Sequence, residues 1–219
     1  MDINTELAKF RESQRYKRNR GIIERLIEDL PEQSRVPLKT FLDKTDIYWA
    51  PASTKYHGNY FGGLAEHIIE VYNILIDHGI EKEMATKVAI IHDFCKLNFY
   101  TPCIKQGDWR EMTPEEYSKY KRENPGGRAQ KIRPEEIGFK IENDPMLGHG
   151  EYSIILAVQA GIPLTLKEMQ IIRWHMGHNE YTNYSFYQNN LLNANRELII
   201  FQFADMISAH EKRENEEDE

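Results

Sequence analysis

The chain has 219 residues, of which 40% are hydrophobic and 29% charged, and its formal net charge is −7. This balance excludes a mainly disordered chain, and the length fits one domain with at most a small appendage. The negative charge disfavours tight binding to long nucleic acid, and the two cysteines, Cys95 and Cys103, form no C-x-x-C zinc motif.

The N-terminal part of the chain is polar and predicts helix. Residues 1–21 lack the apolar core of a signal peptide, and no stretch approaches the roughly 20 apolar residues of a membrane span. We therefore expect a soluble, cytoplasmic protein without a membrane partner. Helical spacing of apolar residues then predicts a short helix that Pro31 ends. Its apolar face consists of Ile22, Ile23, Leu26, Ile27 and Leu30. Residues 1–48 are expected to form an N-terminal helical extension.

Residues 49–63 (WAPASTKYHGNYFGG) combine small residues, Pro and Gly with bulky aromatic rings. So many rings indicate a structured loop and not a linker. A helix closed by Gly79 follows, and its apolar face consists of Leu64, Ile68, Val71 and Leu75. His67 lies one turn before Val71, which places it on the buried side of this helix.

The next apolar run, Met84–Tyr100 (MATKVAIIHDFCKLNFY), predicts a helix buried in the core. One face of this helix carries Met84, Val88, Ile91 and Cys95. The middle of the run holds the adjacent pair His92-Asp93, with Lys96 one turn further on. Burying ionisable groups without partners is costly, so this pair requires a partner inside the core. We read Cys95 as a small core residue.

Residues 101–148 are less regular and rich in Lys and Arg. Thr113 followed by Pro114 predicts a helix start, and the stretch 123–128 (ENPGGR) ends that helix. Patterns of alternating hydrophobicity are scarce throughout the chain. We therefore expect a partly helical insertion.

The C-terminal part predicts two more helices. The capping box Thr165-x-x-Glu168 opens a helix that continues through Met176. A last long helix is predicted over Leu191–His210. Residues 211–219, with six acids against two bases, are expected to be an acidic disordered tail.

Ionisable side chains beside apolar faces recur in five separate segments. They are His67, the pair His92-Asp93, His149, His175 and Asp205. Any one of them is most simply a hydrogen-bonded core residue or an ion-pair partner. Together, directed inward from separate helices, they would cost several kcal/mol per unpaired ion, and a shared cation removes that cost. Histidine and carboxylate ligands suit Mn, Fe, Co, Ni or Zn, so we expect one or two divalent transition-metal ions.

The order of these residues carries a family resemblance. His67, then His92-Asp93, then a distant Asp205 resembles the H…HD…D signature of the HD superfamily of metal-dependent phosphohydrolases. The segment GGLAEHIIEV resembles the family's GGL-x-x-H segment, and IIHDFCKL resembles its hydrophobic-HD-x-x-K segment. The stretch APASTKYHGNYFGGLAEH most resembles the branch of HD-type 3′–5′ exoribonucleases and related prokaryotic and phage HD proteins.

Two positions depart from the family pattern. Cys95 stands where the family often has Gly before the Lys, which we interpret as a packing variation. His57 is followed by Gly58, where related exonucleases often have paired histidines.

The resemblance implies an all-α fold, an HD-domain helical bundle over residues 49–210 with the metal centre in its core. It makes His67, His92, Asp93 and Asp205 ligands of the first metal. Asp93 would bridge to a second metal, and His149 and His175 would complete that site. The expected catalytic residues are Asp93 and Lys96, the latter placed to meet phosphoryl oxygens.

The residues expected to bind substrate lie mainly in the insertion and beside the predicted ligands. The insertion 101–148 follows the predicted metal helix and is expected to fold over the substrate as a lid, the alternative being a solvated surface excursion. The substrate-binding candidates are His57, Arg110, Arg128, Lys131 and His178.

The implied activity is hydrolysis of a phosphate ester through a metal-activated water, by a phosphodiesterase or a nucleotidase. The 48 residues before Trp49 are too few for an added nucleic-acid-binding OB-fold, which favours a small nucleotide-like substrate or a short oligonucleotide. Two alternatives remain: an HD-fold di-iron oxygenase and a non-catalytic metal-binding sensor module. Lys96 argues against the oxygenase, and the filled ligand set argues against the sensor. Substrate, native metal and oligomeric state stay open.

Overall fold

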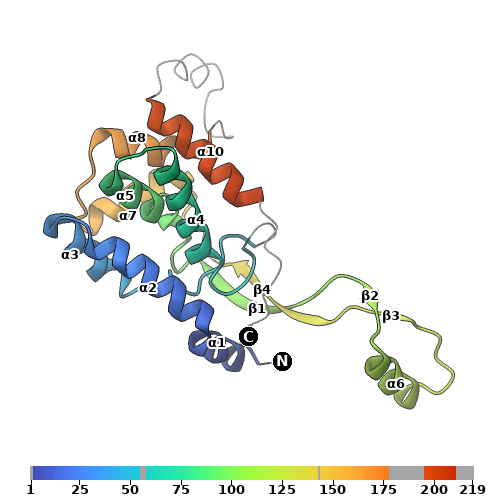
Figure 1. The fold of residues 1–219 in the computed structure, drawn as a ribbon. Helices are drawn as coiled ribbons and strands as arrows, with labels where there is room; N and C mark the ends of the chain where they lie inside the picture. Colours follow the sequence, from blue (N-terminus) through green and yellow to red (C-terminus); the bar gives the residue numbers. More distant parts are fainter. Residues whose placement is uncertain (1, 55–57, 143, 178–194, 211–219) are drawn as a thin grey trace.

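The protein is mainly helical in the computed structural model, which describes residues 2–54, 58–142, 144–177 and 195–210 (Figure 1). The α-helices are α1 (Ile3–Glu12), α2 (Gln14–Glu28), α3 (Glu32–Leu42), α4 (Gly63–Asp77), α5 (Lys82–Ile91), α6 (Pro114–Glu123), α7 (His149–Gln159), α8 (Leu166–Trp174) and α10 (Arg196–His210). A short 3₁₀ helix, η1 (Phe94–Lys96), follows α5. The prediction of a mainly helical fold is therefore confirmed.

Helix α4 lies at the centre of the helical body and packs against α2, α5 and α10. The apolar face predicted for it is buried, and Gly79 follows its end. Helices α2 and α3 contribute to the same hydrophobic core, so residues before Trp49 support the helix that carries His67. Burial of these faces, and not helix propensity alone, stabilises helices of this length.

The prediction of one helix across Met84–Tyr100 is wrong, because α5 ends at Ile91. Asp93 leaves the helical conformation with φ −106° and ψ 21°, and the amide of Lys96 then donates to Asp93 O. The reason lies in a tertiary contact: Ser153 Oγ of α7 donates a 2.7 Å hydrogen bond to the carbonyl of His92. That carbonyl is thereby satisfied without the next helical turn.

The insertion is built on an antiparallel ribbon, which corrects the expectation of an all-α fold. Strands β1 (Tyr100–Gln106) and β4 (Glu135–Ile141) pair from Tyr100↔Ile141 to Gln106↔Glu135. Further out, β2 (Arg110–Glu111) pairs with β3 (Lys131–Ile132), and α6 follows β2. Sequence patterning missed β1 and β4 because neither alternates cleanly between buried and exposed positions.

The foot of this ribbon packs on the helical body, whereas its outer part points away from it (Figure 1). Phe139 of β4 is buried, and its ring contacts Phe61 edge to face. The helix predicted at Thr113 is present as α6, and its capping box forms. The outer part does not cover the body as a lid in this structure.

The remaining predictions differ from the structure mainly at helix ends. The capping box of Thr165 and Glu168 opens α8, which ends at Trp174 and not at Met176. Helix α10 is described from Arg196; residues 191–194 and the predicted tail 211–219 lie outside the described residues. Within the described ranges, no helix combines the length and apolar character that a membrane span needs.

Candidate metal centre

Four helices bring three histidines and two aspartates together in the core. His67 belongs to α4 and Asp205 to α10, whereas His92 and His175 cap the C-terminal ends of α5 and α8. His67 Nε2 lies 3.1 Å from His92 Nε2 and 3.1 Å from Asp205 Oδ1. Asp93 Oδ2 lies 3.3 Å from His92 Nε2. The nitrogen and oxygen atoms that bind transition metals thus converge on one small volume.

The Nδ1 contacts fix the tautomers of the three rings. The Nδ1–H group of His92 donates to the carbonyl oxygen of Ala89 at 2.8 Å. The Nδ1–H group of His175 donates to the carbonyl oxygen of Ile172 at 2.7 Å. Each neutral ring therefore presents an Nε2 lone pair to the cluster, the arrangement found in metal-binding histidines. His175 Nε2 is buried and has no hydrogen-bond partner among the described residues.

His67 is oriented in the same way through a side-chain relay. Its Nδ1 lies 2.8 Å from Ser208 Oγ, and that hydroxyl donates to Glu70 Oε2 at 2.8 Å. The Ser208 hydroxyl donates its proton to Glu70, so in its contact with His67 the Oγ atom accepts from Nδ1–H. Sequence analysis missed Glu70 and Ser208, although each lies three residues after a predicted ligand, His67 or Asp205, and so on the same helix face.

The donor set fits a divalent transition-metal ion. Ligand atoms of His67, His92 and Asp205 all lie within 4.8 Å of one another. Imidazole and carboxylate together suit this class of ion. The His175 nitrogen left without a partner supports the same conclusion, because buried polar atoms are otherwise satisfied by hydrogen bonds.

Burial and neighbouring charges set the protonation of the cluster. Burial lowers the pKa of His67 and, together with nearby His92, lowers that of His175 to about 4, so both rings stay neutral. Burial also opposes protonation of His92, but the carboxylates of Asp93 and Asp205 outweigh it and raise the pKa of this ring.

The two aspartates are ionised despite their burial. Burial opposes ionisation of Asp93, but Lys96 and His92 hold its pKa well below the usual range. Burial likewise opposes ionisation of Asp205, but the neighbouring imidazoles of His67, His175 and His92 lower its pKa. Two ionised carboxylates in a buried site are costly unless positive charge lies beside them.

Lys96 supplies one positive charge to this site. Its Nζ lies 2.6 Å from Asp93 Oδ2, and 12% of its side chain is exposed. Burial alone would lower the pKa of Lys96, but the Asp93 carboxylate outweighs it and the pKa is raised, so the ammonium stays charged. Lys96 is therefore not a solvated surface lysine.

A second group of ligand atoms lies beside the first. Asp93, Cys95 and His149 offer atoms within 4.8 Å of one another, and Cys95 Sγ lies 3.0 Å from His149 Nδ1. His149 is the first residue of α7 and is exposed, whereas Cys95 is buried. Sequence analysis predicted Asp93 and His149 here but assigned Cys95 to packing.

Close packing between α7 and α8 holds this second group in place. A Cβ added at Gly150 would lie 2.4 Å from the carbonyl oxygen of Ile172, so only glycine fits. Glu151 and Arg173 form an ion pair of 2.6 Å across the same contact. The glycine brings the start of α7, and with it His149, against the end of α8 that carries His175.

The predicted substrate-binding residues are not brought to the cluster in the described structure. Arg110 of β2 pairs with Glu116 at 2.6 Å, and Lys131 of β3 lies 3.8 Å from Glu111. These residues and exposed Arg128 belong to the outer part of the insertion, away from the helical body (Figure 1). His57 and His178 lie outside the described residues. A substrate role for these five side chains stays a prediction.

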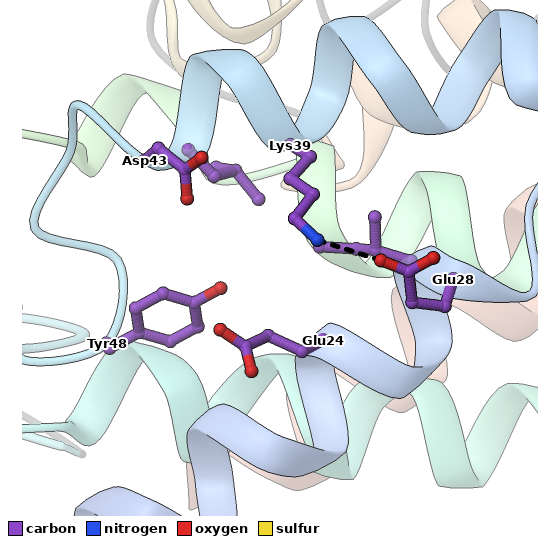
Figure 2. A pocket seen from close by; sticks show the side chains of 7 residues that line it. Glu24, Glu28, Lys39, Asp43 and Tyr48 are labelled. Atoms are coloured by element: carbon purple, nitrogen blue, oxygen red, sulfur yellow. Dashed lines mark hydrogen bonds and ion pairs between the residues drawn. The ribbon is translucent and has the colours of Figure 1, made fainter.

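A pocket elsewhere in the body lies between α2, α3 and the loop that follows α3 (Figure 2). It is lined by Glu24, Ile27, Glu28, Lys39, Leu42, Asp43 and Tyr48. Lys39 Nζ is already paired with Glu28 at 2.8 Å. The lining includes no residue of the histidine cluster, so this pocket is not part of the candidate site.

Comparison of the chain with protein-family models, curated proteins and solved structures finds no significant match. The functional argument therefore rests on the residues and their geometry.

Proposed function

We propose that this protein is a metal-dependent phosphohydrolase of the HD superfamily that hydrolyses a phosphate ester of a nucleotide or a short oligonucleotide. The observation that carries the proposal is the convergence of His67, His92 and Asp205 within 4.8 Å, with Asp93 beside them and Lys96 paired to it. The H…HD…D order selects the two histidines and the two aspartates in the sequence, and the HD-x-x-K segment adds Lys96.

The residues that would hold the first cation are His67, His92, Asp93 and Asp205. A bound divalent transition metal supplies a nucleophilic water at neutral pH and neutralises phosphoryl charge. The chain's own part is to orient each imidazole so that its Nε2 atom faces the cation. The relay from His67 through Ser208 to Glu70 does this for one ring, and backbone carbonyls do it for His92 and His175.

Lys96 provides the charge that favours a phosphate substrate. An ammonium buried beside the metal ligands is positioned to stabilise negative charge on a phosphoryl group as it develops in the transition state. It contacts a carboxylate oxygen in this structure, 2.6 Å away, and a phosphoryl oxygen presents the same kind of acceptor. An oxygenase has no evident use for this cation, so we favour hydrolysis.

A small substrate agrees with the charge distribution. The net charge of −7 opposes the approach of long nucleic acid. Arg110 and Lys131 are engaged with acidic neighbours in the outer insertion, which leaves Lys96 as the cation at the cluster among the described residues.

The test is a hydrolysis screen of metal-free protein reloaded with manganese, cobalt, nickel, iron or zinc. Substrates are bis-p-nitrophenyl phosphate, p-nitrophenyl phosphate, nucleoside mono- and triphosphates and short RNA. We expect metal-dependent release of phosphate or nucleotide, lost in Asp205→Ala, with Asp108→Ala in the outer insertion as a matched control. Inactivity with every metal and substrate, despite full loading, would contradict the proposal. Oxygen consumption by the iron-loaded protein would favour the oxygenase instead.

A further inference from the structure

Cys95 lies among metal-ligating side chains and not only among apolar ones. Its Sγ is 3.0 Å from Nδ1 of His149, a residue 54 positions later in the chain. Asp93 completes a group whose ligand atoms all lie within 4.8 Å of one another. A cation about 2.1 Å from a histidine nitrogen and about 2.3 Å from a thiolate sulfur fits between atoms at such separations.

A second feature of this place is that the Asp93 carboxylate also faces the histidines of the first group. His175 Nε2 is buried, has no hydrogen-bond partner among the described residues, and faces Asp93 Oδ1 at 4.0 Å. The other carboxylate oxygen, Oδ2, contacts Lys96 and faces His92. Asp93 is thus shared between two groups of donors, one containing His67 and His92, the other containing Cys95 and His149.

The backbone holds Cys95 in this position by specific contacts. The amide of Cys95 donates to Ser153 Oγ at 3.1 Å, and that hydroxyl donates to the carbonyl of His92. Ser153 lies on α7, the helix that His149 begins. One side chain therefore ties the turn that carries Cys95 to the helix that carries its partner.

We propose that the thiolate of Cys95 binds a second divalent cation together with His149 and Asp93, its thiol proton passing to solvent. A thiolate in the ligand set favours zinc or cobalt over manganese and magnesium. The first group offers only imidazole and carboxylate, so the two sites differ in the metal they select. Exposure of His149 leaves one side of the second site open, as in zinc sites with three protein ligands and a free position.

This inference rests on the metal-binding part of the proposed function and not on hydrolysis. Its test is therefore spectroscopic. Metal-free protein is titrated with cobalt(II) beyond two equivalents while the near-ultraviolet thiolate-to-cobalt charge-transfer band is recorded. We expect the band to saturate at one sulfur-ligated cobalt per chain, and Cys95→Ser to lack it while still binding cobalt at the first site.

The chain offers a matched control in Cys103, the other free cysteine, which is half-buried on β1. Cys103→Ser should keep the band at full intensity. His149→Ala should weaken cobalt binding at the sulfur site at least about tenfold. No band in saturated wild-type protein, a band that survives in Cys95→Ser, or one lost in Cys103→Ser would each overturn the inference.

A measurement on the wild type alone covers the case in which Cys95→Ser fails to fold. X-ray absorption of the zinc-loaded protein should show a sulfur neighbour at about 2.3 Å. Zinc bound only by nitrogen and oxygen at saturation would overturn the inference. Phosphate-ester hydrolysis by the same preparations tests the proposed function separately. A protein that does not hydrolyse these substrates can still show the cobalt charge-transfer band and the zinc–sulfur distance.

Discussion

His67 and His92 face each other through their Nε2 atoms at 3.1 Å, although the Nδ1 proton of each ring is donated elsewhere. When both rings are neutral, these tautomers offer two lone pairs and no proton to share between them. A cation bound by both nitrogens would satisfy the two lone pairs, and Asp205 Oδ1, 3.1 Å from His67 Nε2, is close enough to join them as a ligand. The relay that fixes the tautomer of His67 is therefore part of the candidate metal centre.

Ser208→Ala should weaken metal binding without removing a ligand. The alanine no longer accepts from Nδ1–H of His67, so the ring loses the contact that fixes its orientation and its tautomer. Loss of such a supporting partner typically lowers metal affinity about 10–100-fold. Competition with a chromophoric chelator measures the affinity.

The control for this variant is Ser34→Ala. Ser34 Oγ is buried on α3 and has no hydrogen-bond partner in the described part of the chain. Its removal should leave metal affinity unchanged. Equal affinity of the wild type and Ser208→Ala would show that the relay does not serve the metal centre.

Lys96→Ala should lower kcat while keeping the metal. Removing an electrostatic donor directed at developing charge typically costs about 10²–10³ in rate. The loss should appear equally in kcat and kcat/KM, the pattern of an interaction made in the transition state. Because Asp93 also loses its 2.6 Å partner, metal content should equal or exceed that of the wild type. Steady-state kinetics and metal analysis on one preparation measure both.

Two further lysine variants test whether the rate depends on the specific cation at position 96. Lys96→Arg should recover only part of the rate, because a planar guanidinium does not replace a compact ammonium in a tight site. Lys105→Met removes a partly exposed lysine that pairs with Glu136 on the ribbon, and should keep full activity. An unchanged kcat in Lys96→Ala would assign the role to another cation.

Gly150→Ala should destabilise the protein and disturb His149. The added methyl group would meet the backbone of Ile172 and Arg173 at 2.4–2.7 Å, which forces α7 away from α8. Overpacking of this kind typically costs about 1–3 kcal/mol, or several degrees in Tm for a chain of this size. In contrast, Gly21→Ala in α2 has nothing within 4 Å and should stabilise by about 0.5–1 kcal/mol. Thermal melting of both variants checks the contrast, and equal shifts would refute it.

Lys87→Met should destabilise the protein strongly. Lys87 Nζ on α5 lies 2.8 Å from Glu168 Oε1 on α8, and only 4% of each side chain is exposed. Breaking a buried pair by removing one partner costs about 3–5 kcal/mol, because the other charge stays buried. Urea denaturation gives the free energy of unfolding.

The double variant Lys87→Met/Glu168→Gln should recover most of that loss. The glutamine carries no charge and still suits the capping box with Thr165. Lys167→Met, which removes an exposed pair with Glu197, should cost no more than about 1 kcal/mol. A double variant as unstable as Lys87→Met would show that packing, and not the unpaired charge, dominates.

The features that could be predicted from the sequence are local ones. The apolar face of α4 follows from spacing within four turns, and it places His67 inside the core. The start of α6 follows from Thr113 and Pro114, and the start of α8 follows from the capping box of Thr165 and Glu168. Each of these signals lies within one helix, where periodicity and capping rules apply directly.

The features that escaped prediction depend on residues distant in sequence. Helix α5 ends at Ile91, and the carbonyl oxygen of the next residue, His92, accepts a hydrogen bond from Ser153, 61 residues later. A further helical turn would have used that oxygen for a backbone hydrogen bond. The sequence around Cys95 indicated a core residue, because its neighbour His149 follows 54 residues later, after the ribbon. The ribbon itself is specified by pairing between β1 and β4, which leaves little trace within either strand.

The pairing of Gln106 with Glu135 gives the ribbon a natural point of division. The two residues are register partners at the outer end of the β1–β4 ladder, and the 28 residues 107–134 between them lie away from the helical body (Figure 1). A short glycine-containing turn can close an antiparallel ladder at such a point. The outer segment is thus separable, and a chain shortened there retains every candidate metal ligand. Whatever the segment contributes to substrate choice can then be measured as a difference between two folded proteins.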